Sequence, residues 1–171
     1  MRLFFAVNFQ NEVKDALTTV QNDLRKQSFC GNFTRYENLH LTLVFIGDVS
    51  ESRVDRLVQI AGSVKAEPFK LRLTQLGRFK RDGGDLIWIG GEKCAPLFSL
   101  HDALATQLRT AGFPLEARPY TPHLTLARGV RLREGFSLSG YSLKSIDATV
   151  TRASLMKSER ISGRLTYTEL A

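Results

Sequence analysis

Apolar positions along the chain predict strands and helices in a repeated order. The short apolar run at 2–8 is typical of a buried strand. After a polar turn, a stripe with three- and four-residue steps predicts a helix, formed by Val13, Ala16, Leu17, Val20 and Leu24. We expect Gly31 to close this helical segment. A second strand is expected at 39–46, ending at Gly47-Asp48.

The rest of the chain continues in the same manner. Ser50 or Ser52 is expected to cap a helix that stops before Pro68. The alternation at 69–76 indicates a half-buried strand. A strand at 86–90 precedes a helix that begins near Pro96 and ends at Gly112. Further strands are predicted at 122–127, 147–157 and 164–170.

A shift of the sequence by 83 residues aligns the two halves of the chain. Phe4-Phe5-Ala6 then falls on Ile87-Trp88-Ile89, the helix at 12–27 falls on the one at 96–110, and His40-Leu41-Thr42-Leu43 falls on His123-Leu124-Thr125-Leu126. This duplication predicts one domain over 1–171, built from two pseudo-symmetric lobes. We expect an α+β fold in which two mainly antiparallel sheets line a central cleft and helices pack outside.

Composition supports a self-sufficient intracellular domain. With 171 residues and 43% hydrophobic content, the chain is able to bury a core without disulfides. Cys30 and Cys94 form no CxxC pair and have no flanking histidines, so we predict free thiols and a cytoplasmic location. The apolar run at the N-terminus is too short for a signal peptide or a membrane span. We expect a soluble monomer.

The charge balance suggests an anionic partner. The chain has 24 Lys and Arg against 17 Asp and Glu, a net charge of +7, which favours binding of polyanions through steering and counterion release. The densest basic groups are Arg78, Lys80 and Arg81, and Arg131 and Arg133. Most isolated charges only keep a surface solvated, so charge alone does not identify the partner.

The two His-Leu-Thr-Leu segments carry the chemistry. Side chains alternate along a strand, so His40 and Thr42 share one face while the leucines enter the core, and His123 and Thr125 do the same. An imidazole titrates near pH ~6.5, so one histidine is able to act as base and the other as acid. The threonine hydroxyls are suited to hold phosphate oxygens. No metal or other cofactor is expected, because two histidines lack a third protein ligand or a carboxylate cluster.

On these residues the chain resembles the two-histidine (2H) phosphoesterases, specifically the RNA 2′,3′-cyclic phosphodiesterase family, also called 2′-5′ RNA ligase. The similarity covers nearly the whole chain, including Arg2–Val7, the extended motif His40–Gly47, Leu86–Gly90, Pro122–Arg128, Ser158 and Gly163–Tyr167. The resemblance implies hydrolysis of RNA 2′,3′-cyclic phosphate ends to 2′-phosphomonoesters, and ligation by the reverse reaction.

The resemblance also implies roles for single residues. His40 would donate a proton to the departing O3′, and His123 would accept one from the attacking water. Thr42 and Thr125 would hold the phosphate, with Arg128 as a fixed cation. Phe45 is a candidate for base stacking, although a strand position fits the core equally well. For Tyr120 and Tyr167, too, the sequence leaves open whether the ring contacts a base or lies in the core. His101 is interpreted as a partly exposed helical histidine.

Two other functions remain open from the sequence. The same site would suit a small cyclic nucleotide or an ADP-ribose cyclic phosphate. Alternatively, the chain would be an RNA-binding module without catalysis. The intact pairs of histidine and threonine argue against loss of activity, and the basic charge favours the longer anion.

Overall fold

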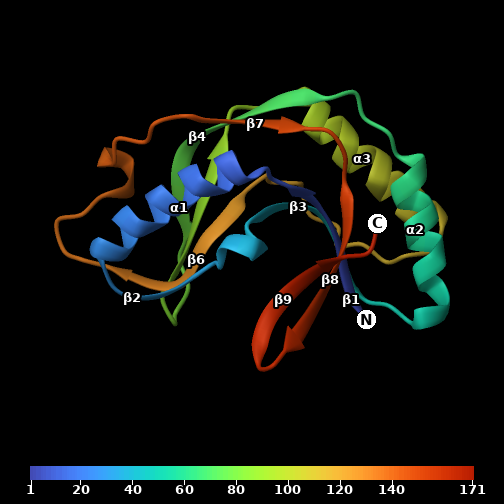
Figure 1. Ribbon diagram of the computed structural model, residues 1–171, viewed down its shortest axis with the longest axis horizontal. Coiled ribbons are helices and arrows are strands. Elements are labelled where there is room, and N and C mark those ends of the chain that lie inside the picture. The colour runs from blue at the N-terminus through green and yellow to red at the C-terminus, as the bar shows by residue number, and fades with distance from the viewer.

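The computed structural model, which describes residues 1–171, has two antiparallel sheets and three α-helices (Figure 1). Across sheet A, the order is β3 (His40–Asp48), β1 (Arg2–Asn8), β8 (Ser154–Ile161) and β9 (Arg164–Glu169). Across sheet B, it is β2 (Ser28–Phe33), β6 (Leu124–Leu132), β5 (Asp85–Gly91), β4 (Phe69–Phe79) and β7 (Ile146–Val150). The predicted α+β class with antiparallel sheets is confirmed.

The two helices that the repeat aligns are exchanged between its halves. Helix α1 (Asn11–Lys26) contacts β2, β6 and β7 of sheet B. Helix α2 (Val54–Ser63) contacts β8, and α3 (Ala95–Thr110) contacts β3, both in sheet A (Figure 1). Helices α1 and α3 therefore each cover the sheet that carries the other half's motif, whereas α2 lies on the sheet that carries the motif of its own half. None of these helices combines the length and the apolar character needed to span a bilayer.

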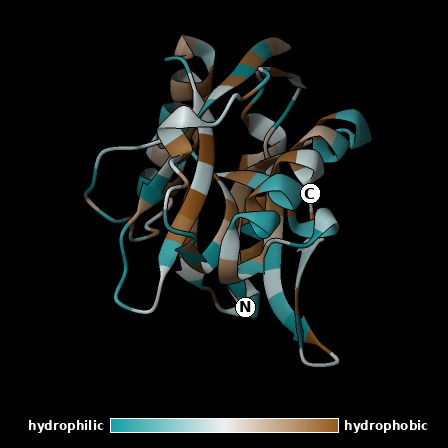
Figure 2. Cartoon of the chain, turned by 90° about the vertical axis from the view of Figure 1, so that its left-hand side faces the viewer, coloured by the Kyte–Doolittle hydropathy of each residue, from teal (hydrophilic) through white to brown (hydrophobic).

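Strand β1 explains why its sequence is apolar without alternation. It lies between β3 and β8, and its residues 3–7 are all buried. Leu3, Phe5 and Val7 belong to the main core of 35 residues, which includes side chains from both sheets and all three helices. Phe4 and Ala6 point to the other face and pack with Met156 and Tyr167. Other strands show the bands of apolar and polar residues that a half-buried sheet requires (Figure 2).

Several boundaries differ from the sequence prediction. Helix α1 ends at Lys26, and Gly31 lies instead in the unpredicted strand β2. No serine side chain caps α2, because a 3₁₀ turn at Glu51–Arg53 comes first and the hydroxyls of Ser50 and Ser52 face each other at 3.1 Å. The single strand expected at 147–157 is wrong. It is divided into β7 in sheet B and β8 in sheet A.

Candidate functional site

His40 is the first residue of β3, and both of its ring nitrogens have partners. Nδ1 donates to the backbone carbonyl oxygen of Asn38 at 2.7 Å. A carbonyl only accepts hydrogen bonds, so the proton of the neutral ring resides on Nδ1. Nε2 lies 3.1 Å from the Thr42 hydroxyl and is the nitrogen available for proton transfer.

His123, the residue directly before β6, repeats the Nδ1 contact. Its Nδ1 donates to the carbonyl oxygen of Thr121, also two residues earlier in the chain, at 2.8 Å. In both motif histidines Nδ1 is therefore occupied by a backbone carbonyl, and Nε2 is the nitrogen that the backbone leaves free. We refer to His40, Thr42, His123 and Thr125 together as the motif site.

A β-bulge in each motif strand brings one more residue to the face on which the motif side chains lie. In β3, Phe5 pairs with Val44 and Ala6 with Thr42, so Leu43 is the extra residue. Leu43 and Val44 are both buried, and Phe45 returns to the face of His40 and Thr42, where it is 39% exposed. Strict alternation would have placed Phe45 on the opposite face.

The same bulge occurs at the equivalent point of β6. Ile87 pairs with Ala127 and Trp88 with Thr125, which leaves Leu126 as the extra residue. Leu126 and Ala127 are both fully buried, and the exposed Arg128 returns to the face of Thr125. Phe45 and Arg128, each five residues after a motif histidine, thus occupy corresponding positions.

The two motif strands, β3 and β6, contact each other, so charges of the second motif act on His40. Burial is the main cause that lowers the pKa of His40 below its usual value, and the charges of Arg128, Lys14 and His123 lower it further. The hydrogen bond to Asn38 opposes this shift. The neutral form of His40 is therefore favoured in the free protein.

Three residues surround His40: the sequence left a site role for Tyr167 open and gave no indication of Phe4 or Asn38. The rings of Phe4 and Tyr167 lie 5.0 and 4.9 Å from the imidazole, with Tyr167 edge-on. Asn38 is 4% exposed, donates through Nδ2 to Leu165 O at 2.9 Å and accepts from the Tyr167 backbone N–H at 3.3 Å. Strand β9 thereby fixes the loop that orients His40. No local sequence signal links residues this far apart.

Aromatic side chains also support His123 in sheet B. Phe79 lies 5.3 Å from the imidazole, edge-on, and 5.6 Å from the Trp88 ring. Trp88 lies over Gly77 of the neighbouring strand, where an added Cβ would be 2.1 Å from the indole. The indole Nε1 is buried and has no hydrogen-bond partner.

Hydroxyl groups fix the backbone of both motif threonines. The Tyr120 hydroxyl donates to Thr42 O at 3.1 Å, and the Thr34 hydroxyl donates to Thr125 O at 2.8 Å. Burial raises the pKa of Tyr120, so this donor keeps its proton. Tyr120 stacks on His101 at 4.1 Å, and His101 is partly exposed on α3, as expected.

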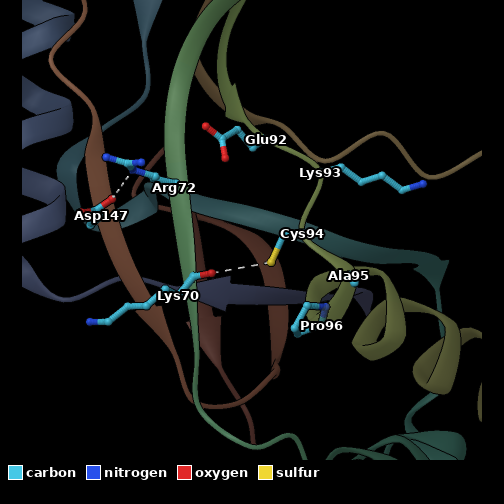
Figure 3. A pocket seen from close by; sticks show the side chains of 8 residues that line it. All are labelled: Lys70, Arg72, Glu92, Lys93, Cys94, Ala95, Pro96 and Asp147. Carbon is cyan, nitrogen blue, oxygen red and sulfur yellow. Dashed lines mark hydrogen bonds and ion pairs between the residues drawn. The ribbon is translucent and has the colours of Figure 1, made fainter.

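A separate cavity of about 490 Å³ lies where β4 and β7 meet the start of α3 (Figure 3). Arg72 is paired there with Asp147 at 3.2 Å, and the Cys94 thiol donates to Lys70 O at 3.7 Å. The residues that line this cavity include none from the motif site. Nowhere in the chain do three or more His, Cys, Asp or Glu side chains form a group suited to a metal ion.

Comparison with known proteins assigns a family to this geometry. The model of the 2′-5′ RNA ligase superfamily matches residues 10–161. An RNA 2′,3′-cyclic phosphodiesterase of Thermotoga maritima is 31% identical over 131 residues, which cover 75% of this chain and 70% of the relative. One from Escherichia coli is 30% identical over 173 residues, covering 99% and 93%. The crystal structure of E. coli LigT complexed with 3′-AMP has a TM-score of 0.78 and 28% identity, covering 99% and 95%.

Proposed function

The chain belongs to the 2′-5′ RNA ligase superfamily, and from this we propose that it hydrolyses 2′,3′-cyclic phosphate ends of RNA to 2′-phosphomonoesters. The observation that carries the proposal is the pair of His-x-Thr motifs, each with Nδ1 bound to a carbonyl and Nε2 available. Curated relatives named RNA 2′,3′-cyclic phosphodiesterase support the substrate class.

The proposed reaction needs one base and one acid. Nε2 of His123 accepts a proton from water as the water oxygen bonds to phosphorus. Nε2 of His40 donates a proton to O3′ as the P–O3′ bond breaks, which leaves a 3′-hydroxyl and a 2′-phosphomonoester. Thr42, Thr125 and Arg128 hold the non-bridging oxygens and stabilise the charge that develops on them.

The protonation of His40 depends on the bound phosphate in this scheme. Burial and neighbouring cations favour neutral His40 in the free protein, whereas an acid must carry a proton. A phosphodiester anion at the motif site attracts positive charge and raises the pKa of His40. Substrate binding therefore prepares the acid. The reverse reaction, using the same groups, would join a cyclic phosphate and a 5′-hydroxyl end through a 2′-5′ bond.

We also propose that the protein works without a metal ion, as a monomer in the cytoplasm. Both motifs lie in one chain, so no second copy is needed to complete the site. Cys30 and Cys94 are free thiols, which suits a reducing compartment.

The test uses an oligoribonucleotide with a 2′,3′-cyclic phosphate end and identifies the product. Wild-type protein should convert the oligonucleotide only to the form with a 2′-phosphomonoester end. The rate of hydrolysis should be the same with and without EDTA. H40A and H123A should each lose about 10²–10⁴-fold in kcat. The matched control, H101A, removes the third histidine and should keep most of the activity.

Four results would contradict the proposal. Unchanged hydrolysis in either motif variant would remove the two-histidine mechanism. Loss of activity in EDTA would indicate a metal-dependent enzyme. Absence of turnover combined with RNA binding would indicate a binding module. Much faster turnover of a cyclic mononucleotide than of the oligonucleotide would indicate the small-molecule activity.

A further inference from the structure

Beyond Arg128, a row of cations continues along β6 and into the residue that follows its end. A second bulge lies at Gly129, since Ile87 pairs with Ala127 but Asp85 pairs with Val130. Gly129 has a φ of +64°, a conformation that glycine adopts without strain. Val130 is consequently buried at 2%, and alternation places the exposed Arg131 on the side of Arg128. Arg133, also exposed, follows directly after the last residue of β6. We name Arg128, Arg131 and Arg133 the arginine row.

The arginine row is available for an external anion. None of its three guanidinium groups forms an ion pair with a carboxylate of the chain. By contrast, Arg78 at the nearby β4–β5 hairpin is already paired with Asp85 at 3.2 Å. Uncompensated cations in a line are the electrostatic pattern that follows a nucleic-acid backbone.

An exposed aromatic residue accompanies the row on the edge strand β2. Phe29 is 67% exposed, and the Arg133 guanidinium lies 4.9 Å from the centre of its ring. Arg133 is held in place because its Nε donates to Lys26 O at 3.2 Å. A solvent-facing aromatic ring beside cations provides a stacking surface for an unpaired base.

The β4–β5 turn extends the positive charge on the other side of β6. An added Cβ at Gly84 would lie 2.6 Å from the backbone of Gly129, so this turn packs directly against the bulge. The turn carries Lys80 and Arg81, both exposed. The arginine row is thus flanked by Phe29 on one side and by further cations on the other.

We propose that the arginine row binds the backbone phosphates of single-stranded RNA on the 5′ side of the cyclic end, with Phe29 stacking on one of its bases. The inference rests on the proposed function, because the row starts at the phosphate position next to Thr125. From Thr125 to Arg133 the extended chain spans roughly 20–25 Å, enough for several nucleotides. The protein therefore prefers an oligonucleotide to a mononucleotide that carries the same reactive end.

The test compares uridine 2′,3′-cyclic phosphate with an eight-nucleotide oligouridylate that has the same end. For the double variant R131Q/R133Q, kcat/KM on the octamer should fall about tenfold. The slope of log(kcat/KM) against log[salt] should become less steep by about 1.4, because two phosphate contacts are lost. F29A, which keeps every charge, should lose about fivefold or more on the octamer. Both variants should match wild type on the mononucleotide.

The control is R56Q/R109Q, which removes the same charge from α2 and α3 and should behave as wild type on both substrates. Equal losses for the two double variants would overturn the proposal, as would equal losses on the two substrates. If wild-type protein hydrolyses neither substrate, the proposed function fails by itself. In that case the affinity for the labelled octamer, measured by fluorescence anisotropy, tests the arginine row. An affinity of R131Q/R133Q equal to that of wild type would refute RNA binding by the row.

Discussion

Gly77→Ala tests how tightly the aromatic support of His123 is packed. Gly77 lies opposite Trp88 in the β4–β5 ladder, and the added methyl carbon would be 2.1 Å from the indole. Carbon atoms in contact lie ~3.5–4.0 Å apart, so the ring must move by about 1.4 Å or more. The ring also lies closely over Gly90, where an added Cβ would be 3.1 Å away, so it has little room to move to that side.

The expected cost combines two opposing effects. Overpacking of a well-packed site costs about 1–3 kcal/mol. Replacing a strand glycine recovers about 0.5–1 kcal/mol of backbone entropy. The net loss should be about 0.5–2 kcal/mol, which lowers Tm by roughly 1–8 °C for a chain of this size. Displacement of Trp88 also disturbs Phe79 and His123, so hydrolysis of the cyclic phosphate should slow.

The measurement uses the fluorescence of Trp88, the only tryptophan in the chain. Urea unfolding should show a lower midpoint for G77A, and its native emission should differ from that of wild type. The control is Gly62→Ala in α2, where nothing lies within 4 Å of the added methyl group. That variant should be as stable as wild type or up to about 1 kcal/mol more stable. A wild-type midpoint together with wild-type emission in G77A would refute the packing argument.

Two further predictions concern the environment of the motifs. Arg128→Gln removes a cation that lowers the pKa of His40, so this pKa should rise and the alkaline fall of kcat/KM should move to higher pH, while kcat/KM itself decreases. The measurement is the pH profile of kcat/KM for R128Q and wild type. An alkaline limb of R128Q that stays at the wild-type pH or moves to lower pH would contradict the proposed role of His40 as the acid. Tyr120→Phe removes the hydrogen bond to Thr42 O but keeps the ring, so it should cost about 1 kcal/mol in urea unfolding. Tyr120→Ala removes the ring as well as the hydroxyl and should be less stable than Y120F. If the two variants are equally unstable, Y120F has lost the ring stacking too, and the loss cannot be assigned to the hydrogen bond alone.

Local pattern was sufficient for most elements. The apolar run of β1 and the stripe of α1 predicted their types, because burial imposes a period that is visible within a few residues. Strand β2 was missed because five of its six residues are not buried and it contains Gly31, so it shows neither alternation nor an apolar run. It forms because the β6 edge provides a partner for its backbone.

The division of the tail into β7 and β8 also depended on distant partners. Residues 147–157 read as one strand, but Ile146–Val150 pairs with β4 while Ser154–Ile161 pairs with β1 and β9. Which sheet a strand joins is decided by the edges available in the folded chain. The serine caps failed for a comparable reason, since the backbone chose a 3₁₀ turn before α2.

The sequence by itself determined the two His-x-Thr pairs, their repeat and the faces on which they lie, because alternation along a strand is a local property. Only the tertiary structure decided that Phe45 and Arg128 share those faces, since each depends on a bulge that is defined by pairing with another strand. It also brought Asn38 and Tyr167 to His40, and Phe79 to His123. These contacts join residues far apart in the chain, and no local pattern of apolar and polar positions encodes them.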